Sequence, residues 1–158
     1  MSAQPILRML LILAIVTGSV CWVAGQEQEK KVTAAQVPSI IITNFKSAYP
    51  HALILGYSSE KEDGKQYYEI ESRDGTLHRD VLYNPDGSVA EIEETIATND
   101  LPAAIQESFR RQHPRGVITL AEKTTAGDKV TYEVKAREGR KRFSVEFDAD
   151  GKVIKGKP

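Results

Sequence analysis

A short acidic segment near the end of the chain has the beginning of a calcium-binding loop. Asp148-Ala149-Asp150-Gly151 places carboxylates at the first and third positions, as such loops do. The fifth position must supply another oxygen ligand, and Lys152 stands there instead. We therefore expect this segment to form a hairpin turn and not a cation site.

The histidines do not form a local metal-binding pattern. His51, His78 and His113 are far apart, and none has another His or a Cys two to four residues away. A compact metal site needs ligands at such spacings. A site assembled from distant parts of the chain is the less favoured alternative, so we predict no metal ligand.

Two glutamates could suggest the carboxylate pair of a glycosidase. Glu69 and Glu133, however, occupy equivalent places in the repeat described below, so we expect each to face a basic residue on a neighbouring strand. The chain has no Gly-x-Ser-x-Gly elbow for a nucleophilic serine. We predict no catalytic residue and no cofactor, and a hydrolase with a dispersed site is the least favoured class.

Charge gives little reason to expect a nucleic-acid partner. Charged residues make up 27% of the 158 residues, the formal net charge is −1, and Lys and Arg are scattered among Asp and Glu. A protein that binds phosphate backbones usually carries a basic patch or stripe. Nucleic-acid binding is therefore not predicted.

The N-terminal segment is typical of a secretory signal peptide. Arg8 precedes an apolar run over residues 9–16, and Val23-Ala24-Gly25 ends in a small residue before a polar stretch. We expect a signal peptide over residues 1–25, a flexible leader over 26–36, and a periplasmic or secreted protein. An uncleaved membrane anchor is the alternative, and the membrane would be a partner only in that case. Cys21 fits a lipoprotein motif poorly, so we expect a mature chain without cysteine.

The mature part repeats itself at an offset of 64 residues without a gap. Matches fall on apolar positions and turn residues, which are the positions that a fold constrains. The matching segments include Val37-Pro38 with Leu101-Pro102, Phe45 with Phe109, Tyr68-Glu69 with Tyr132-Glu133, and Asp86-Gly87 with Asp150-Gly151. We predict a first copy over residues 37–97 and a second over 98–158.

Each copy is expected to contain one helix followed by four antiparallel strands. Apolar residues at helical spacing start each copy, and Pro50 and Pro114 end the two helices. Later segments alternate in polarity and are separated by Asp-Gly and Gly-containing turns. A single copy of about 60 residues would be marginally stable. We therefore predict an α+β fold with one continuous eight-stranded sheet and both helices on one face.

The double pattern of Leu/Val-Pro, Phe, Pro, Tyr-Glu-Val/Ile and x-Asp-Gly-x-Val resembles the PepSY-like proteins. These are also described as similar to the β-lactamase-inhibitor protein fold. The resemblance covers nearly all of residues 37–155 and implies a periplasmic or secreted protein with helices on one face of an antiparallel sheet. It also implies binding or inhibition of other proteins, including peptidases or β-lactamases. The family brings no catalytic motif.

The sheet face away from the helices is the candidate binding surface. Strand alternation predicts that the first copy places apolar, aromatic and charged side chains there: Leu53, Leu55, Tyr57, Tyr67, Glu69, His78 and Leu82. Such a combination is common at protein interfaces. We expect an exported, non-enzymatic module that binds another protein, with inhibition of a peptidase or other envelope enzyme as its role. A structural or stress-related envelope protein that self-associates as a homo-oligomer is the alternative.

Overall fold

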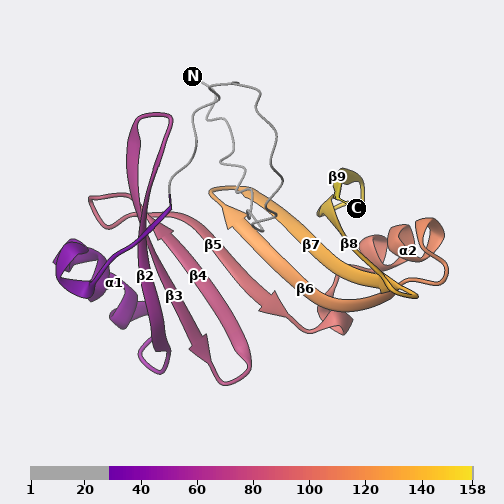
Figure 1. Cartoon of the computed structure of the whole chain (residues 1–158), viewed down its shortest axis with the longest axis horizontal. Coiled ribbons are helices and arrows are strands. Elements are labelled where there is room, and N and C mark those ends of the chain that lie inside the picture. Colours follow the sequence, from indigo (N-terminus) through magenta and orange to yellow (C-terminus); the bar gives the residue numbers. More distant parts are fainter. Residues whose placement is uncertain (1–28, 158) are drawn as a thin grey trace, which may run out of the picture.

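The protein folds into one antiparallel sheet with two α-helices, in a computed structural model that describes residues 29–157 (Figure 1). The helical elements are η1 (Ala34–Gln36), α1 (Ser39–Ala48), η2 (Thr98–Asp100) and α2 (Ala103–Gln112). The strands are β1 (Lys30–Lys31), β2 (Leu53–Glu62), β3 (Lys65–Asp74), β4 (Leu77–Tyr83), β5 (Val89–Ile96), β6 (Val117–Ala126), β7 (Lys129–Glu138), β8 (Lys141–Asp148) and β9 (Val153–Lys157).

The sheet has nine strands in sequence order, so every strand pairs antiparallel with its neighbour in the chain. The α+β class and the continuous sheet agree with the sequence prediction, but the predicted number of eight strands is wrong. The additional strand is β1, which pairs with Ser58 and Ser59 of β2. The N–H of Val32 then donates to the carbonyl of Tyr57 at 3.0 Å. Part of the expected flexible leader is therefore joined to the edge of the sheet.

Both helices begin and end at matching residues of the two copies. Pro38 and Pro102 come directly before the first helical residue. An N–H at this position would have no partner within the helix, so a proline there costs no intrahelical hydrogen bond. The N–H groups of Tyr49 and His113 close the last turns by donating to the carbonyls of Phe45 and Phe109 at 2.8 Å. The next residue in each copy is a proline, which cannot continue the helix.

Turn residues connect the strands as the sequence predicts. Asp63 and Gly64 both have positive φ, 49° and 78°, which is the conformation of a tight two-residue hairpin turn. In the segment that resembled a calcium loop, the carboxylate of Asp148 accepts from the N–H groups of Asp150 and Lys152 at 3.1 and 2.9 Å. The predicted hairpin turn between β8 and β9 is confirmed.

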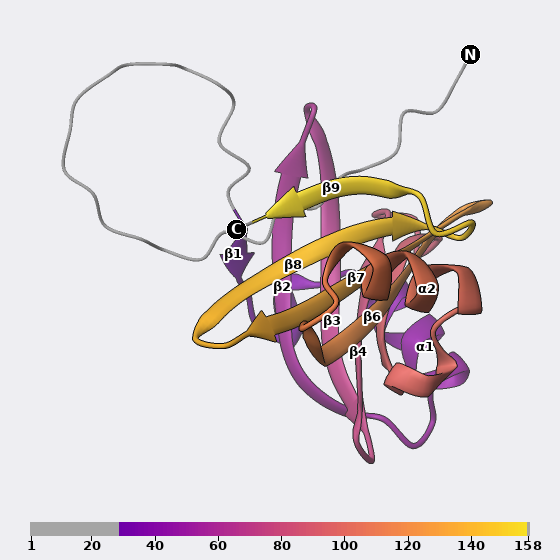
Figure 2. The same ribbon diagram turned by 90° about the vertical axis from the view of Figure 1, so that its right-hand side faces the viewer.

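Two hydrophobic clusters hold the helices against one face of the sheet. Ile41 and Phe45 of α1 pack on strands β3 and β4, and Ile105 and Phe109 of α2 pack on strands β6 to β8. Ile92 joins the first cluster and Ile96 the second, and the two residues lie four positions apart on β5, which is two steps of the strand alternation. Side chains two residues apart on a strand point to the same face. Both helices therefore cover the same face of the twisted sheet (Figure 2).

The predicted signal peptide, with Cys21, lies outside the described residues. Within residues 29–157, neither helix has the length and hydrophobicity that crossing a bilayer requires.

We expect that replacing Phe45 or Phe109 with alanine will destabilise the protein by about 3–5 kcal/mol, because each ring is buried in its cluster. The copies share one sheet, so thermal unfolding followed by circular dichroism should show a single transition that either change lowers. Two melting steps, each sensitive to only one substitution, would show that the copies unfold independently.

Gly151 should tolerate a side chain worse than other glycines with positive φ. Its φ is 81°, and a Cβ there would lie 2.6 Å from the carbonyl oxygen of Ala104 in α2. Gly139 has a φ of 61° and open space around its Cβ position. We expect Gly151→Ala to destabilise the protein by more than about 1 kcal/mol beyond Gly139→Ala in urea unfolding. Equal effects would show that the contact with α2 contributes nothing.

Candidate binding face

The sheet face opposite α1 and α2, hereafter the open face, is formed by the residues that alternate with the core. Ile70, Val81 and Ile92 point toward α1, so their neighbours along each strand point the other way. Five of the seven predicted surface residues share this open face: Leu53, Tyr67, Glu69, His78 and Leu82. No helix in the described part of the chain lies on this side.

A row of side chains across β2 to β5 forms the buried centre of the open face. Ser58, Glu69, Leu82 and Glu91 are consecutive partners along the row, with exposed fractions of 6, 9, 0 and 2%. The hydroxyl of Ser58 donates to Oε2 of Glu69 at 3.2 Å. Tyr67, two residues before Glu69 on β3 and on the same face, is also buried. The centre therefore combines apolar side chains with carboxylates.

Further carboxylates surround this row in the first copy. Glu71, Asp80 and Glu93 are partners in the next row. The acidic residues of β2 to β5 on the open face are Glu60, Glu62, Glu69, Glu71, Asp80, Glu91 and Glu93, and the lysines and arginines are Lys65 and Arg73. The open face of the first copy is therefore acidic.

The second copy balances its acidic side chains with basic ones. Nζ of Lys135 lies 2.7 Å from Oε2 of Glu122 and 3.6 Å from Oε2 of Glu133. Burial lowers the pKa of Lys135, but its hydrogen bond to Glu122 and the nearby carboxylates outweigh that effect, so its pKa lies above the ordinary value. Other basic residues on this half of the open face are Lys129, Arg137, Arg142 and Lys155.

Tyr57 does not belong to the open face, contrary to the sequence prediction. It pairs with Ile70 and packs against the cluster beneath α1. The cause is a β-bulge between Ile54 and Gly56, which inserts one residue and reverses the alternation that follows. Leu55 lies at this bulge and is 45% exposed. The second copy has the same bulge between Ile118 and Leu120.

The sequence prediction missed most of the open-face carboxylates. Glu71, Asp80, Glu91 and Glu93 lie in the two central rows but were not predicted. A signal was present, since residues 69–71 and 91–93 both read Glu-Ile-Glu. Two glutamates flanking an apolar residue on a strand must share the face away from the core.

Neither of the two matched glutamates stands opposite the basic residue that the sequence prediction places on a neighbouring strand. Glu69 stands opposite Ser58 and Leu82, so a basic cross-strand partner is wrong there. Glu133 stands opposite Glu122 and Glu146, and its basic neighbour is Lys135 on the same strand. Within residues 29–157, no group of three or more His, Cys, Asp or Glu side chains is arranged to hold a metal ion.

An ion pair closes the core on the helix side of the first copy. Nε of Arg79 donates to Oε1 of Glu94 at 2.6 Å, and the guanidinium lies 4.0 Å from the ring centre of Tyr49. Arg79 is 9% exposed, so this pair is shielded from solvent. Tyr83 packs nearby, and its burial raises the pKa of its hydroxyl to about 12.

The family described as "Putative beta-lactamase-inhibitor-like, PepSY-like" matches residues 18–87 and again residues 66–155. The chain belongs to this family. The two matches correspond to the two tandem copies. No curated protein matches the chain by sequence.

Three solved structures of similar fold come from Bacteroides species. One, described as a putative periplasmic protein from Bacteroides eggerthii, has a TM-score of 0.62 and 17% identity, covering 77% of this chain and 88% of that one. A DUF2874 family protein from Bacteroides ovatus has a TM-score of 0.60 and 16% identity, covering 77% and 87%. A BLIP-like protein from Bacteroides fragilis has a TM-score of 0.57 and 18% identity, covering 77% and 85%. At these identities the likeness establishes the fold alone.

We expect the alkaline stability of the protein to depend on Tyr83. Its pKa is near 10 in the unfolded chain and about 12 in the folded one. The unfolded state therefore loses the proton first, and stability that is fully present below pH 10 falls as the pH rises toward 12. Urea unfolding from pH 9 to 12 should show a smaller loss for Tyr83→Phe than for the unmodified protein. Equal losses would assign the alkaline transition to other groups.

Proposed function

We propose that this chain is an exported, non-enzymatic module that binds another protein on the open face of its first copy. The observation that carries the proposal is that no described helix covers this face, which presents Leu53 at 56% exposure and carries seven carboxylates against two basic side chains on strands β2 to β5. Interfaces commonly combine an apolar, tightly packed centre with a charged rim. A rigid sheet also loses little conformational entropy when it binds.

The charge of this face sets the chemistry of the partner. A surface with many more carboxylates than cations attracts a protein that presents lysine and arginine side chains, and it accelerates their encounter at low salt. The partner should therefore present a basic surface to the first copy. The balanced charges of the second copy would add less to this attraction.

An inhibitory role toward a peptidase or another envelope enzyme is the second part of the proposal. It is supported by the family description and by the BLIP-like description of one protein of similar fold. Export is supported by the N-terminal sequence and by the periplasmic description of another such protein. An inhibitor on this fold would cover the entrance to an active site with its sheet face.

Site-specific photo-crosslinking in intact cells would test the binding face. A photoreactive phenylalanine analogue replaces Leu53 on the open face or, as a control, Ile40 on α1; these residues are 56 and 45% exposed. We expect an adduct with a different, basic protein from position 53 and none from position 40. An adduct between two copies of the chain would favour the self-associating envelope protein, and no adduct at position 53 would contradict the proposal.

Charge reversal would test the electrostatic part. Glu71→Lys with Asp80→Lys changes two paired residues of the open face. Glu107→Lys with Asp128→Lys makes the same change in net charge on α2 and in the turn after β6. The first pair should reduce adduct formation by at least about tenfold, because each like-charge contact costs binding energy. Equal effects of both pairs would show that net charge, and not this face, governs binding.

A further inference from the structure

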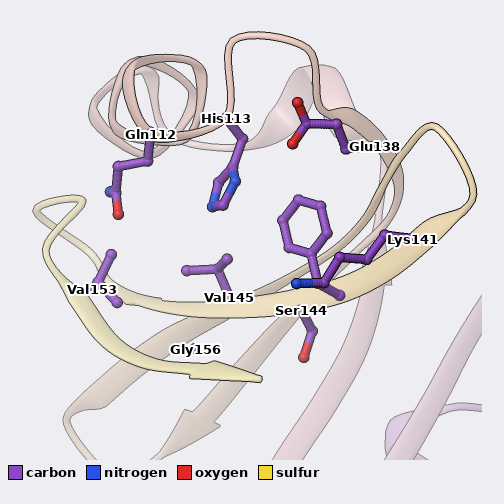
Figure 3. A pocket seen from close by; sticks show the side chains of 9 residues that line it. Gln112, His113, Glu138, Lys141, Ser144, Val145, Val153 and Gly156 are labelled. Carbon is purple, nitrogen blue, oxygen red and sulfur yellow. The ribbon is translucent and has the colours of Figure 1, made fainter. Parts of the chain in front are cut away.

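The second copy contains a cavity at a place that side chains fill in the first copy. The cavity has a volume of about 320 Å³ and lies between the end of α2 and strands β8 and β9 (Figure 3). Its lining residues include Gln112, His113, Lys141, Phe143, Val145 and Gly156. Figure 3 shows His113 pointing from the end of the helix into this space.

The residues at the matching positions of the first copy, 64 positions earlier, explain why this space is filled in the first copy and open in the second. In the first copy, Ile92 pairs with Val81 and packs in the core; in the second, Gly156 pairs with Val145 at the matching place. Apart from Gly156 itself and its two neighbours in the chain, no heavy atom lies within 4 Å of the position that a Cβ of Gly156 would take. The volume that the branched side chain of Ile92 fills in one copy is therefore unfilled in the other.

The wall of this space also differs between the copies. Tyr49 and Arg79 form a closed cation–π contact in the first copy, and Arg79 is further held by Glu94. The matching residues of the second copy are His113 and Phe143, whose ring centres are 4.4 Å apart. In the second copy, the aromatic ring of Phe143 therefore stands where the first copy has the ion-paired Arg79, and this ring can contact an apolar group.

Two polar groups at the cavity remain available to a ligand. Glu138 is engaged by Nε of Arg115 at 2.9 Å, and the amide nitrogen of Gln112 donates to Ser108. Within residues 29–157, Nζ of Lys141 and the ring nitrogens of His113 have no hydrogen-bond partner in the structure. Because the C-terminal end of α2 carries partial negative charge, an anionic group should lie on the side of Lys141.

We propose that this cavity binds a branched aliphatic carboxylate, with the aliphatic group in the space matching Ile92 and the carboxylate at Lys141. Apolar walls with a few polar groups at the rim are typical of small-molecule sites, and the volume is at the lower end of their range. The carboxylate could belong to a free acid or to the C-terminal residue of a peptide. This inference concerns the second copy and is independent of binding on the open face.

Nuclear magnetic resonance titration of the full mature chain would test the site. The probes are N-acetyl-isoleucine, its C-terminal amide, and 3-methylpentanoate. We expect N-acetyl-isoleucine to shift the signals of Gly156 and His113, and the amide to bind at least about tenfold more weakly because it lacks the charge at Lys141. Tighter binding of N-acetyl-isoleucine than of 3-methylpentanoate would assign the site to peptide termini, and comparable binding to free acids.

Two variants and one control make the result decisive. Gly156→Ile should remove the shifts and raise the Tm by about 2–4 °C, because it fills open space on an extended strand. Lys141→Gln should weaken binding of the acid by about tenfold and leave the amide unaffected, whereas Lys129→Gln, at an exposed end of β7, should change neither. The proposal would be overturned if a probe at about 10 mM, on the order of the weakest binding of interest, caused no shifts. Shifts that persist in Gly156→Ile would also overturn it.

Discussion

The antiparallel pairing of β5 with β6 is the interaction on which the arrangement of the molecule depends. It joins the last strand of the first copy to the first strand of the second, from Ile92 opposite Thr125 to Ile96 opposite Ala121. The same strand contributes to both hydrophobic clusters through Ile92 and Ile96, which lie four positions apart and so point to the same face. This geometry places α1 and α2 on one side and leaves the other side of all nine strands as a continuous face.

The repeated scaffold allows the two copies to differ in chemistry without differing in backbone. Helix ends, bulges and two of the three hairpin glycines recur 64 residues apart, and these are the features that backbone geometry demands. Side chains that the backbone does not constrain have diverged. The first copy has an acidic open face and a closed ion pair under α1, while the second has balanced charges and a cavity at Gly156. A tandem pair can in this way present two surfaces of different specificity on one rigid sheet.

Most of the fold could be predicted from the sequence, whereas the candidate face could be predicted only in part. Helix ends were predictable because Pro50 and Pro114 forbid continuation, and hairpins because Asp-Gly pairs favour positive φ. Tyr57 was assigned to the wrong face because a bulge changes the alternation without a clear mark in the sequence. The strand β1 was missed because two exposed lysines carry no hydrophobic pattern, and only the available edge of β2 makes them a strand.

The sequence by itself determined the two helices, the hairpin turns, the repeat and most members of each core, since these follow from residue type and spacing along the chain. The tertiary structure alone decided which charges become neighbours. Glu71, Asp80 and Glu93 lie on three different strands and become neighbours because strand register places them in one row. It also decided that Gly156 leaves a cavity, because a missing side chain becomes empty space only where helix, strand and neighbouring rings enclose it.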